Sequence, residues 1–137
     1  GADAAASAAL AHWCWYICDR GPLAQAIAAT NYAIEGVTGE WAQLVCSSDC
    51  YAESLPELKR KAGMRWLRAH ARYDDAHPWE ALEIVAAILG AQPNARDVQG
   101  IRTAMRRSYD YMRLTLEDCI ADVEFGTDST GSQDRAA

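Results

Sequence analysis

Residues 22–46, PLAQAIAATNYAIEGVTGEWAQLVC, decide the fold class of this 137-residue chain. Pro22 suits the first turn of a helix, and small residues then recur as far as Gly39. Because small side chains let another helix approach closely, we expect a central helix from Pro22 to about Cys46. The rest of the chain is rich in Ala, Leu, Glu and Arg, and no run alternates for long as a strand would. The sequence therefore predicts an all-α protein, a bundle of about four helices.

The first and last helices of this bundle carry clear apolar stripes. The first is predicted over residues 4–18, with a stop at the Arg-Gly-Pro of residues 20–22. The last is predicted over residues 95–123. The stripes expected to face the core hold Leu10, Trp13, Cys14 and Ile17 in the first helix and Ile101, Met105, Tyr109, Met112, Leu116 and Cys119 in the last.

The third helix is expected to follow a loop over residues 47–55. Pro56 opens it, with acidic residues near its N-terminus, and Gly90 is a plausible C-cap. Residues 126–137 contain almost nothing apolar and are expected to be disordered. The predicted organisation is one helical domain over residues 1–125, followed by this tail.

The net charge of the chain argues against nucleic acid as a partner. The chain has 13 Lys and Arg against 19 Asp and Glu, a net charge of −6, and no sign of the basic surface that nucleic acid requires. No apolar run approaches the roughly 20 residues that span a bilayer, and the N-terminus does not resemble a signal peptide. Five cysteines are an odd number, which fits reduced thiols and a cytoplasmic location.

Four of the cysteines form two pairs at helical i, i+4 spacing, Cys14 with Cys18 and Cys46 with Cys50. Two interpretations are open. The pairs could supply four thiolates to zinc, although structural zinc sites usually have C-x-x-C spacing. Alternatively, they are small buried apolar side chains.

The segment 70–84, HARYDDAHPWEALEI, carries the densest polar motif. On one helix His70, Asp74 and His77, at i, i+4 and i+7, fall within one stripe. That stripe is either part of a metal site or a polar face turned to water. Pro78 follows directly, and because it cannot donate to the carbonyl of Asp74, the helix is expected to bend or restart there.

Glu35 favours the metal interpretation. It lies among small and apolar residues of the central helix, where an unpaired carboxylate would be costly to bury. If the second and third helices are neighbours, Glu35 can join His70, Asp74 and His77 in a mixed nitrogen and oxygen ligand set, which suits Fe(II), Mn(II) or Zn(II). The alternative is a buried polar network, or a pair with an arginine such as Arg68 or Arg72.

Other polar and aromatic residues receive structural interpretations. Acidic neighbours of the motif are expected to face solvent or to support the ligands, tryptophans to lie in the core or an interface, and the remaining histidine to be a core residue. These are Asp75 and Glu80; Trp41, Trp66 and Trp79; and His12.

Longer segments resemble a known family. The blocks AHWCWY, AIAATNYAIEGVTGEW, LVCS, RWLRAHARYDDAHPWEALEI and RSYDYM, spread over residues 9–120, are similar to the C-terminal part of the 1-undecene synthases. These are bacterial non-haem iron fatty-acid decarboxylases of the haem-oxygenase-like iron oxidase superfamily. The resemblance implies the C-terminal part of a haem-oxygenase-like helical bundle.

The resemblance also implies a site and a reaction. The metal ligands of the family match Glu35, His70, Asp74 and His77, and they would hold one or two iron ions. Fe2+ with O2 would then decarboxylate a medium-chain fatty acid, such as dodecanoic acid, to a terminal alkene. The metal would supply the positive charge that attracts the substrate carboxylate to an acidic protein.

The remaining ligands of the family are absent from this chain, which contains no E-x-x-H. A start at Gly1 without methionine fits a fragment of a longer protein. We therefore expect a homodimer, or association with a missing N-terminal half, because exposed apolar faces favour association.

Two other functions stay open. One is a related iron oxidase of the same fold acting on another substrate. The other is a metal-free helical binding or dimerisation module, which a salt-bridged Glu35 and failure to bind Fe2+ would favour.

Overall fold

The structure is a computed structural model that describes the backbone of residues 5–72 and 76–126 and the side chains of residues 5–72 and 76–118. Every element in these ranges is a helix, so the prediction of an all-α fold is confirmed. In chain order they are α1 (Ala5–Arg20), α2 (Leu23–Ile27), η2 (Ala28–Ile34), α3 (Glu35–Cys46), α4 (Cys50–Ser54), α5 (Glu57–Gly63), α6 (Arg65–Ala71), α7 (Ala76–Leu89) and α8 (Ala95–Gly126).

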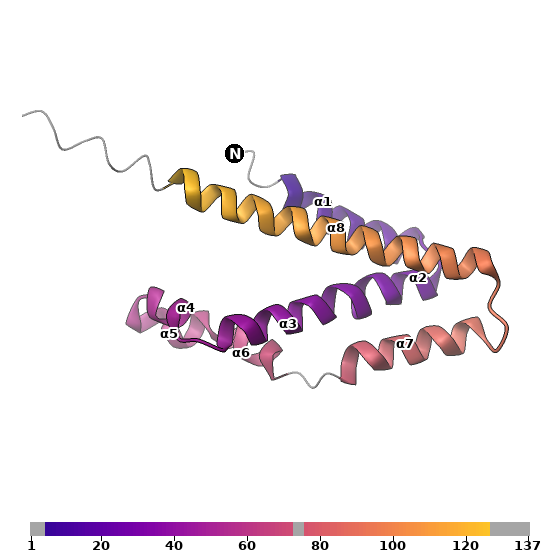
Figure 1. Cartoon of the computed structure of the whole chain (residues 1–137), viewed down its shortest axis with the longest axis horizontal. Helices are drawn as coiled ribbons and strands as arrows, with labels where there is room; N and C mark the ends of the chain where they lie inside the picture. The colour runs from indigo at the N-terminus through magenta and orange to yellow at the C-terminus, as the bar shows by residue number, and fades with distance from the viewer. Residues whose placement is uncertain (1–4, 73–75, 127–137) are drawn as a thin grey trace, which may run out of the picture.

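The central helix predicted from residues 22–46 is present, as α2, η2 and α3 in direct succession. Figure 1 shows it between two flanking layers, with α1 and α8 on one side and α6 and α7 on the other. Ala28, Ala29 and Ala33 of η2 are fully buried. Because these side chains are so small, α8 and α7 both pack closely against the same short segment.

One feature of the central helix was not predicted, the π-helix η2. Its seven residues widen the turn, so that the backbone N–H of Glu35 donates to the carbonyl of Thr30 rather than to that of Asn31. The hydroxyl of Thr30 donates a hydrogen bond to the carbonyl of Ala26 at 2.8 Å. This side-chain donor gives the carbonyl a partner other than a backbone N–H. Such wide turns are rare and often occur at functional sites.

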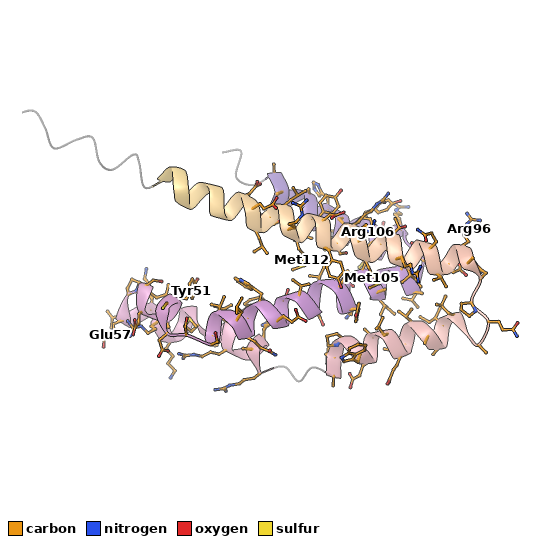
Figure 2. All side chains as sticks on the ribbon, viewed as in Figure 1. Tyr51, Glu57, Arg96, Met105, Arg106 and Met112 are labelled. Carbon is orange, nitrogen blue, oxygen red and sulfur yellow. The ribbon has the colours of Figure 1, made fainter. Side chains whose placement is uncertain are left out.

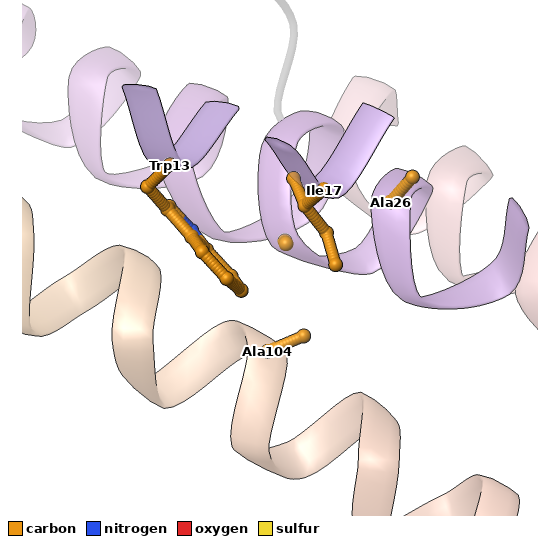
Figure 3. Close-up of a cluster of buried hydrophobic side chains, with 5 residues drawn as sticks. Trp13, Ile17, Ala26 and Ala104 are labelled. Atoms are coloured by element: carbon orange, nitrogen blue, oxygen red, sulfur yellow. The ribbon is translucent and has the colours of Figure 1, made fainter. Parts of the chain in front are cut away.

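The tightest core lies between α1, the start of the central helix and α8. Trp13 and Ile17 of α1 point toward Ala104 of α8 (Figure 3). The indole Nε1–H of Trp13 donates to the hydroxyl of Ser108 at 2.8 Å, and both residues are buried. The buried polar groups therefore satisfy each other inside an apolar cluster.

The two outer helices end close to the predicted residues, but only part of each predicted apolar stripe is buried. In α8, Tyr109 and Leu116 are 38% and 40% exposed. Helix α1 stops at Arg20, where a Cβ on Gly21 would meet the carbonyl of Ile17. Leu10 and Cys14 are only half-buried, whereas Ile101 of α8 is buried. Met105 and Met112 lie on the side of α8 turned toward the central helix (Figure 2).

Two parts of the predicted helix arrangement differ from the structure, and one agrees with it. The loop expected over residues 47–55 contains the short helix α4. The single third helix is divided into α5, α6 and α7. Gly90 ends α7 as predicted, with a φ of 71° that favours glycine.

Pro78 explains where α7 can begin. It is the third residue of α7, a position whose N–H would have no partner within the helix. The helix restarts two residues before Pro78, at Ala76, and α7 then runs through His77 and Pro78 without the bend expected after His77.

The predicted tail, residues 126–137, lies outside the described residues apart from Gly126, which ends α8. Within the described ranges, no helix combines the length and apolar character needed to cross a membrane.

Candidate functional site

The polar motif of segment 70–84 does not form one helical stripe. His70 belongs to α6, which ends at Ala71, and His77 belongs to α7, which begins at Ala76. Asp74 and Asp75 lie outside the described residues. The i, i+4, i+7 argument was therefore wrong in assuming one continuous helix through the motif.

Glu35 also differs from its prediction. It is exposed at the first position of α3 and not buried among apolar residues. Among the described residues it forms no ion pair with Arg68 or Arg72. The widened turn of η2 directly before it changes which side of the helix residue 35 occupies.

The start of α3 nevertheless lies against the start of α7. A Cβ on Gly36 would stand 3.7 Å from the ring atoms of Pro78, an ordinary van der Waals distance. Glu35 and His77 are therefore the direct sequence neighbours of two residues that approach each other. The condition on which the proposed ligand set depended, that the second and third helices are neighbours, is met at this point.

Each histidine of the motif has a local partner. The ring of His70 lies 3.9 Å from that of Trp66 between centroids, and its Nδ1 is 2.9 Å from the carbonyl oxygen of Trp66. The tautomer protonated at Nδ1 donates to this carbonyl and leaves Nε2 as an acceptor. Nδ1 of His77 lies 3.7 Å from a carboxylate oxygen of the exposed Glu80.

No group of three or more His, Cys, Asp or Glu side chains among the described residues is arranged to hold a metal ion. Since Asp74 is not described, the set Glu35, His70, Asp74 and His77 stays a prediction, as does iron with O2. Anaerobic Fe2+ titration of the chain and of His70→Ala tests it: loss of near-stoichiometric binding in the variant is the predicted result.

Other predictions about single residues can be compared directly. His12 is exposed, so it is not a core histidine. Trp41, Trp66 and Trp79 are 40%, 50% and 61% exposed and contribute only part of their surface to packing. Cys14, Cys18, Cys46 and Cys50 are free thiols, and burial, with the nearby Cys18, raises the pKa of Cys14 above 9.0.

A different set of side chains comes together between the central helix, α7 and α8. Tyr32 and Trp79 make an edge-to-face pair with ring centroids 6.1 Å apart. Burial, followed by the neighbouring Tyr32 and Glu40, raises the pKa of Tyr109 above 10.0. We call Tyr32, Glu40, Trp79 and Tyr109 the aromatic corner.

The aromatic corner has the chemistry of a cation site. Tyr32 contacts Trp79, Tyr109 lies near both Tyr32 and the carboxylate of Glu40, and both Trp79 and Tyr109 keep exposed surface, 61% and 38%. Aromatic faces attract cations, and a neighbouring carboxylate adds direct charge attraction. A tyrosine phenol is protonated at neutral pH, so the hydroxyl of Tyr109 can act as a donor.

The sequence analysis missed this corner for a physical reason. Tyr32, Gly36 and Glu40 are spaced i, i+4 and i+8 on the central helix, and that spacing could have been noticed. Tyr109 comes from the last helix, where it was assigned to an apolar stripe. Only the packing of α8 on η2 brings it to Tyr32.

Comparison with solved structures gives an informative match. No protein-family profile and no curated protein matches the chain. Among solved structures, it is similar to a crystal structure of a TenA homolog from Pseudomonas syringae pv. tomato strain DC3000, with 53% identity and a TM-score of 0.80. The match covers 85% of this chain and 48% of that chain, so this chain spans about half the length of the matched protein.

This match contradicts the resemblance to the iron oxidases. The matched structure is described as a TenA homolog and not as a 1-undecene synthase. The similarity of the sequence blocks therefore pointed to the wrong family. The predicted iron-dependent decarboxylation of fatty acids is overturned by this finding.

Proposed function

We propose that this chain is part of an enzyme of the TenA, or thiaminase-II, type. The observation that carries the proposal is the 53% identity and TM-score of 0.80 to a TenA homolog over 85% of the chain. A similarity of this extent concerns the whole helical arrangement and not a single motif. The chain spans about half the length of the matched protein, so the activity is proposed for the full TenA-type fold, formed by association of the chain with a second copy or with the rest of that fold.

The aromatic corner supports a substrate that is flat and positively charged. Trp79 and Tyr32 offer aromatic faces, and Glu40 offers a carboxylate. Thiamin has both features, a planar pyrimidine and a cationic thiazolium ring. The chain's net charge of −6 further favours a cation over an anion at long range.

The corresponding reaction is cleavage of the bond that joins the two rings of thiamin. Water supplies the oxygen that bonds to the bridging methylene carbon, and the carbon–nitrogen bond to the thiazolium ring breaks. Its electron pair stays on the thiazole nitrogen, which becomes neutral, and a proton is released. In this proposal the corner binds and orients the cation, and Glu40 stabilises its charge.

Thiamin cleavage tests the proposal. Thiamin is incubated with the chain, and the pyrimidine alcohol and the thiazole are quantified by chromatography. We expect both products in equal amounts and a loss of at least about tenfold in rate for Glu40→Gln. Glu83→Gln is the matched control, because Glu83 is an exposed glutamate of α7 outside the corner. No product from the chain at any concentration, alone or mixed with the remainder of a TenA-type fold, contradicts the proposal.

We also propose that the exposed apolar surface is covered by association, with a second copy or with the missing half of the fold. Trp15, Leu23 and Leu44 are 64–76% exposed. Large exposed apolar side chains in such number are typical of interaction surfaces. Sedimentation is expected to give a mass above 15.0 kDa, and a monodisperse monomer contradicts association with a second copy.

A further inference from the structure

A concave site lies on the side of α8 away from the aromatic corner, between α1, the start of α2 and α8. It is a groove of about 290 Å³. Aromatic and apolar side chains from α1 form one wall, and polar and glycine residues of α8 form the other. Its lining includes Trp13, Tyr16, Arg20, Gln25, Gly100 and Arg107.

Arg107 gives the groove its charge. Its guanidinium carbon lies 5.6 Å from the centre of the Trp13 ring, a cation–π distance. Among the described residues Arg107 has no carboxylate partner, whereas Arg20 at the far side of the groove pairs with Asp19 at 2.7 Å. Arg107 is thus the cation in the groove that is available to an added anion.

The aromatic wall is fixed in place. The Trp13 ring is held by the hydrogen bond to Ser108 and packs on Tyr16 with centroids 6.1 Å apart. Tyr16 is 58% exposed, so part of its ring is open to solvent. A preformed aromatic surface beside a guanidinium can bind a planar ring by stacking and its acidic group by charge.

We infer that this groove binds a small planar ring compound that carries an anionic group, a carboxylate or phosphate. The volume of about 290 Å³ suits a ligand of one or two fused rings with a single acidic group. The expected selectivity is opposite to that of the aromatic corner, which attracts cations. The two sites lie on different faces of α8, and the inference does not depend on the proposed function.

Titration with 1-naphthyl phosphate tests the inference, with calorimetry and the NMR signal of the Trp13 indole N–H as readouts. We expect a Kd below about 1 mM, a shift of the Trp13 signal, and binding at least about tenfold weaker for inorganic phosphate or 1-naphthol alone. Equal affinity for phosphate alone, or a Trp13 signal that does not move, overturns the inference.

Arg107→Gln should weaken binding about tenfold. Arg96→Gln is the matched control, because Arg96 lies at the N-terminal end of α8, away from the groove (Figure 2), and should change affinity less than twofold. An equal loss in both variants overturns the inference.

A further variant, Gly100→Ala, changes the shape of the groove and keeps the charge of Arg107. A Cβ on Gly100 would collide with the Gln25 amide, which is the far end of a flexible side chain. Gly100→Ala should therefore keep the helix, since alanine favours it, and shift the amide of Gln25, which lines the groove, so that affinity changes. Unchanged affinity for 1-naphthyl phosphate in this variant contradicts binding in the groove and stays informative if Arg107→Gln fails to fold.

Discussion

Trp13 and Trp79 show how differently two tryptophans of the same bundle are used. Trp13 is 7% exposed, and its indole N–H donates to the buried Ser108. Trp79 is 61% exposed and makes an edge contact with Tyr32. The first arrangement stabilises the fold. The second leaves part of the Trp79 ring exposed near the carboxylate of Glu40 and the phenol of Tyr109, where a ligand can contact it.

The small residues of the central helix account for this contrast. Alanines at positions 26 and 29 let α1 and α8 close around Trp13. On the α7 side, Gly36 approaches Pro78 at an ordinary contact distance, and neighbouring aromatic rings remain at the edge of the contact. The same composition therefore yields a sealed core on one side and an open corner on the other.

Truncating the two tryptophans should give the largest difference. Trp13→Ala is expected to lower the free energy of unfolding by about 3–5 kcal/mol, because it removes a buried ring and leaves a cavity. Trp79→Ala should cost at most about 1.5 kcal/mol, the value of an exposed aromatic pair. Urea denaturation measures both, and equal losses would break the comparison.

Two adjacent residues of α8, Ser108 and Tyr109, allow the same comparison with the loss of a single hydroxyl group. Ser108→Ala should lower the free energy of unfolding by about 1–3 kcal/mol, because the buried indole N–H of Trp13 loses its acceptor. Tyr109→Phe should change it by less than about 0.5 kcal/mol, since Tyr109 is partly exposed. Urea denaturation of the two variants gives both values, and a larger loss in Tyr109→Phe would mean that the corner is structural.

Substitutions of Gly21 and Gly36 compare how much room the backbone leaves for a side chain at the end of α1 and at the contact of α3 with α7. A Cβ on Gly21 would lie 2.5 Å from the carbonyl oxygen of Ile17, so Gly21→Ala should destabilise the fold by about 1–3 kcal/mol. At Gly36 the same Cβ meets Pro78 at 3.7 Å. Gly36→Ala should therefore be neutral, or stabilising by up to about 1 kcal/mol through helix propensity. Thermal unfolding measures both, and a melting temperature lowered equally in the two variants would refute the distinction.

The smallest expected effect is one of pH. Because burial raises the pKa of Cys14 in the folded state, the thiol of the unfolded chain ionises first, near pH 9.0. The unfolded state then binds fewer protons, so the free energy of unfolding should fall as pH rises above about 9. Cys14→Ala should flatten this slope between pH 8 and 10 in urea titrations, and an unchanged slope would contradict the assignment.

Features of the fold that depend on neighbouring residues alone could be predicted from the sequence. The Arg-Gly-Pro stop at residues 20–22, the Gly90 cap and the small-residue central helix followed from propensity and sterics. The aromatic corner could not be predicted in the same way, because Tyr109 reaches Tyr32 only through the packing of α8 on the central helix. Glu35 was wrongly predicted to be buried. A regular α-helix was assumed through residues 28–34, and no local sequence pattern indicated the π-helix that is present there.

Binding of thiamin to the aromatic corner is the most direct test of the account. Calorimetric titration compares thiamin with its uncharged pyrimidine alcohol, using the parent chain, Trp79→Ala and Glu83→Gln. The account predicts at least about tenfold tighter binding of the cation, lost in Trp79→Ala and kept in Glu83→Gln. Equal affinity for the charged and uncharged compounds, or full binding by Trp79→Ala, would contradict the assignment of the corner as the substrate site.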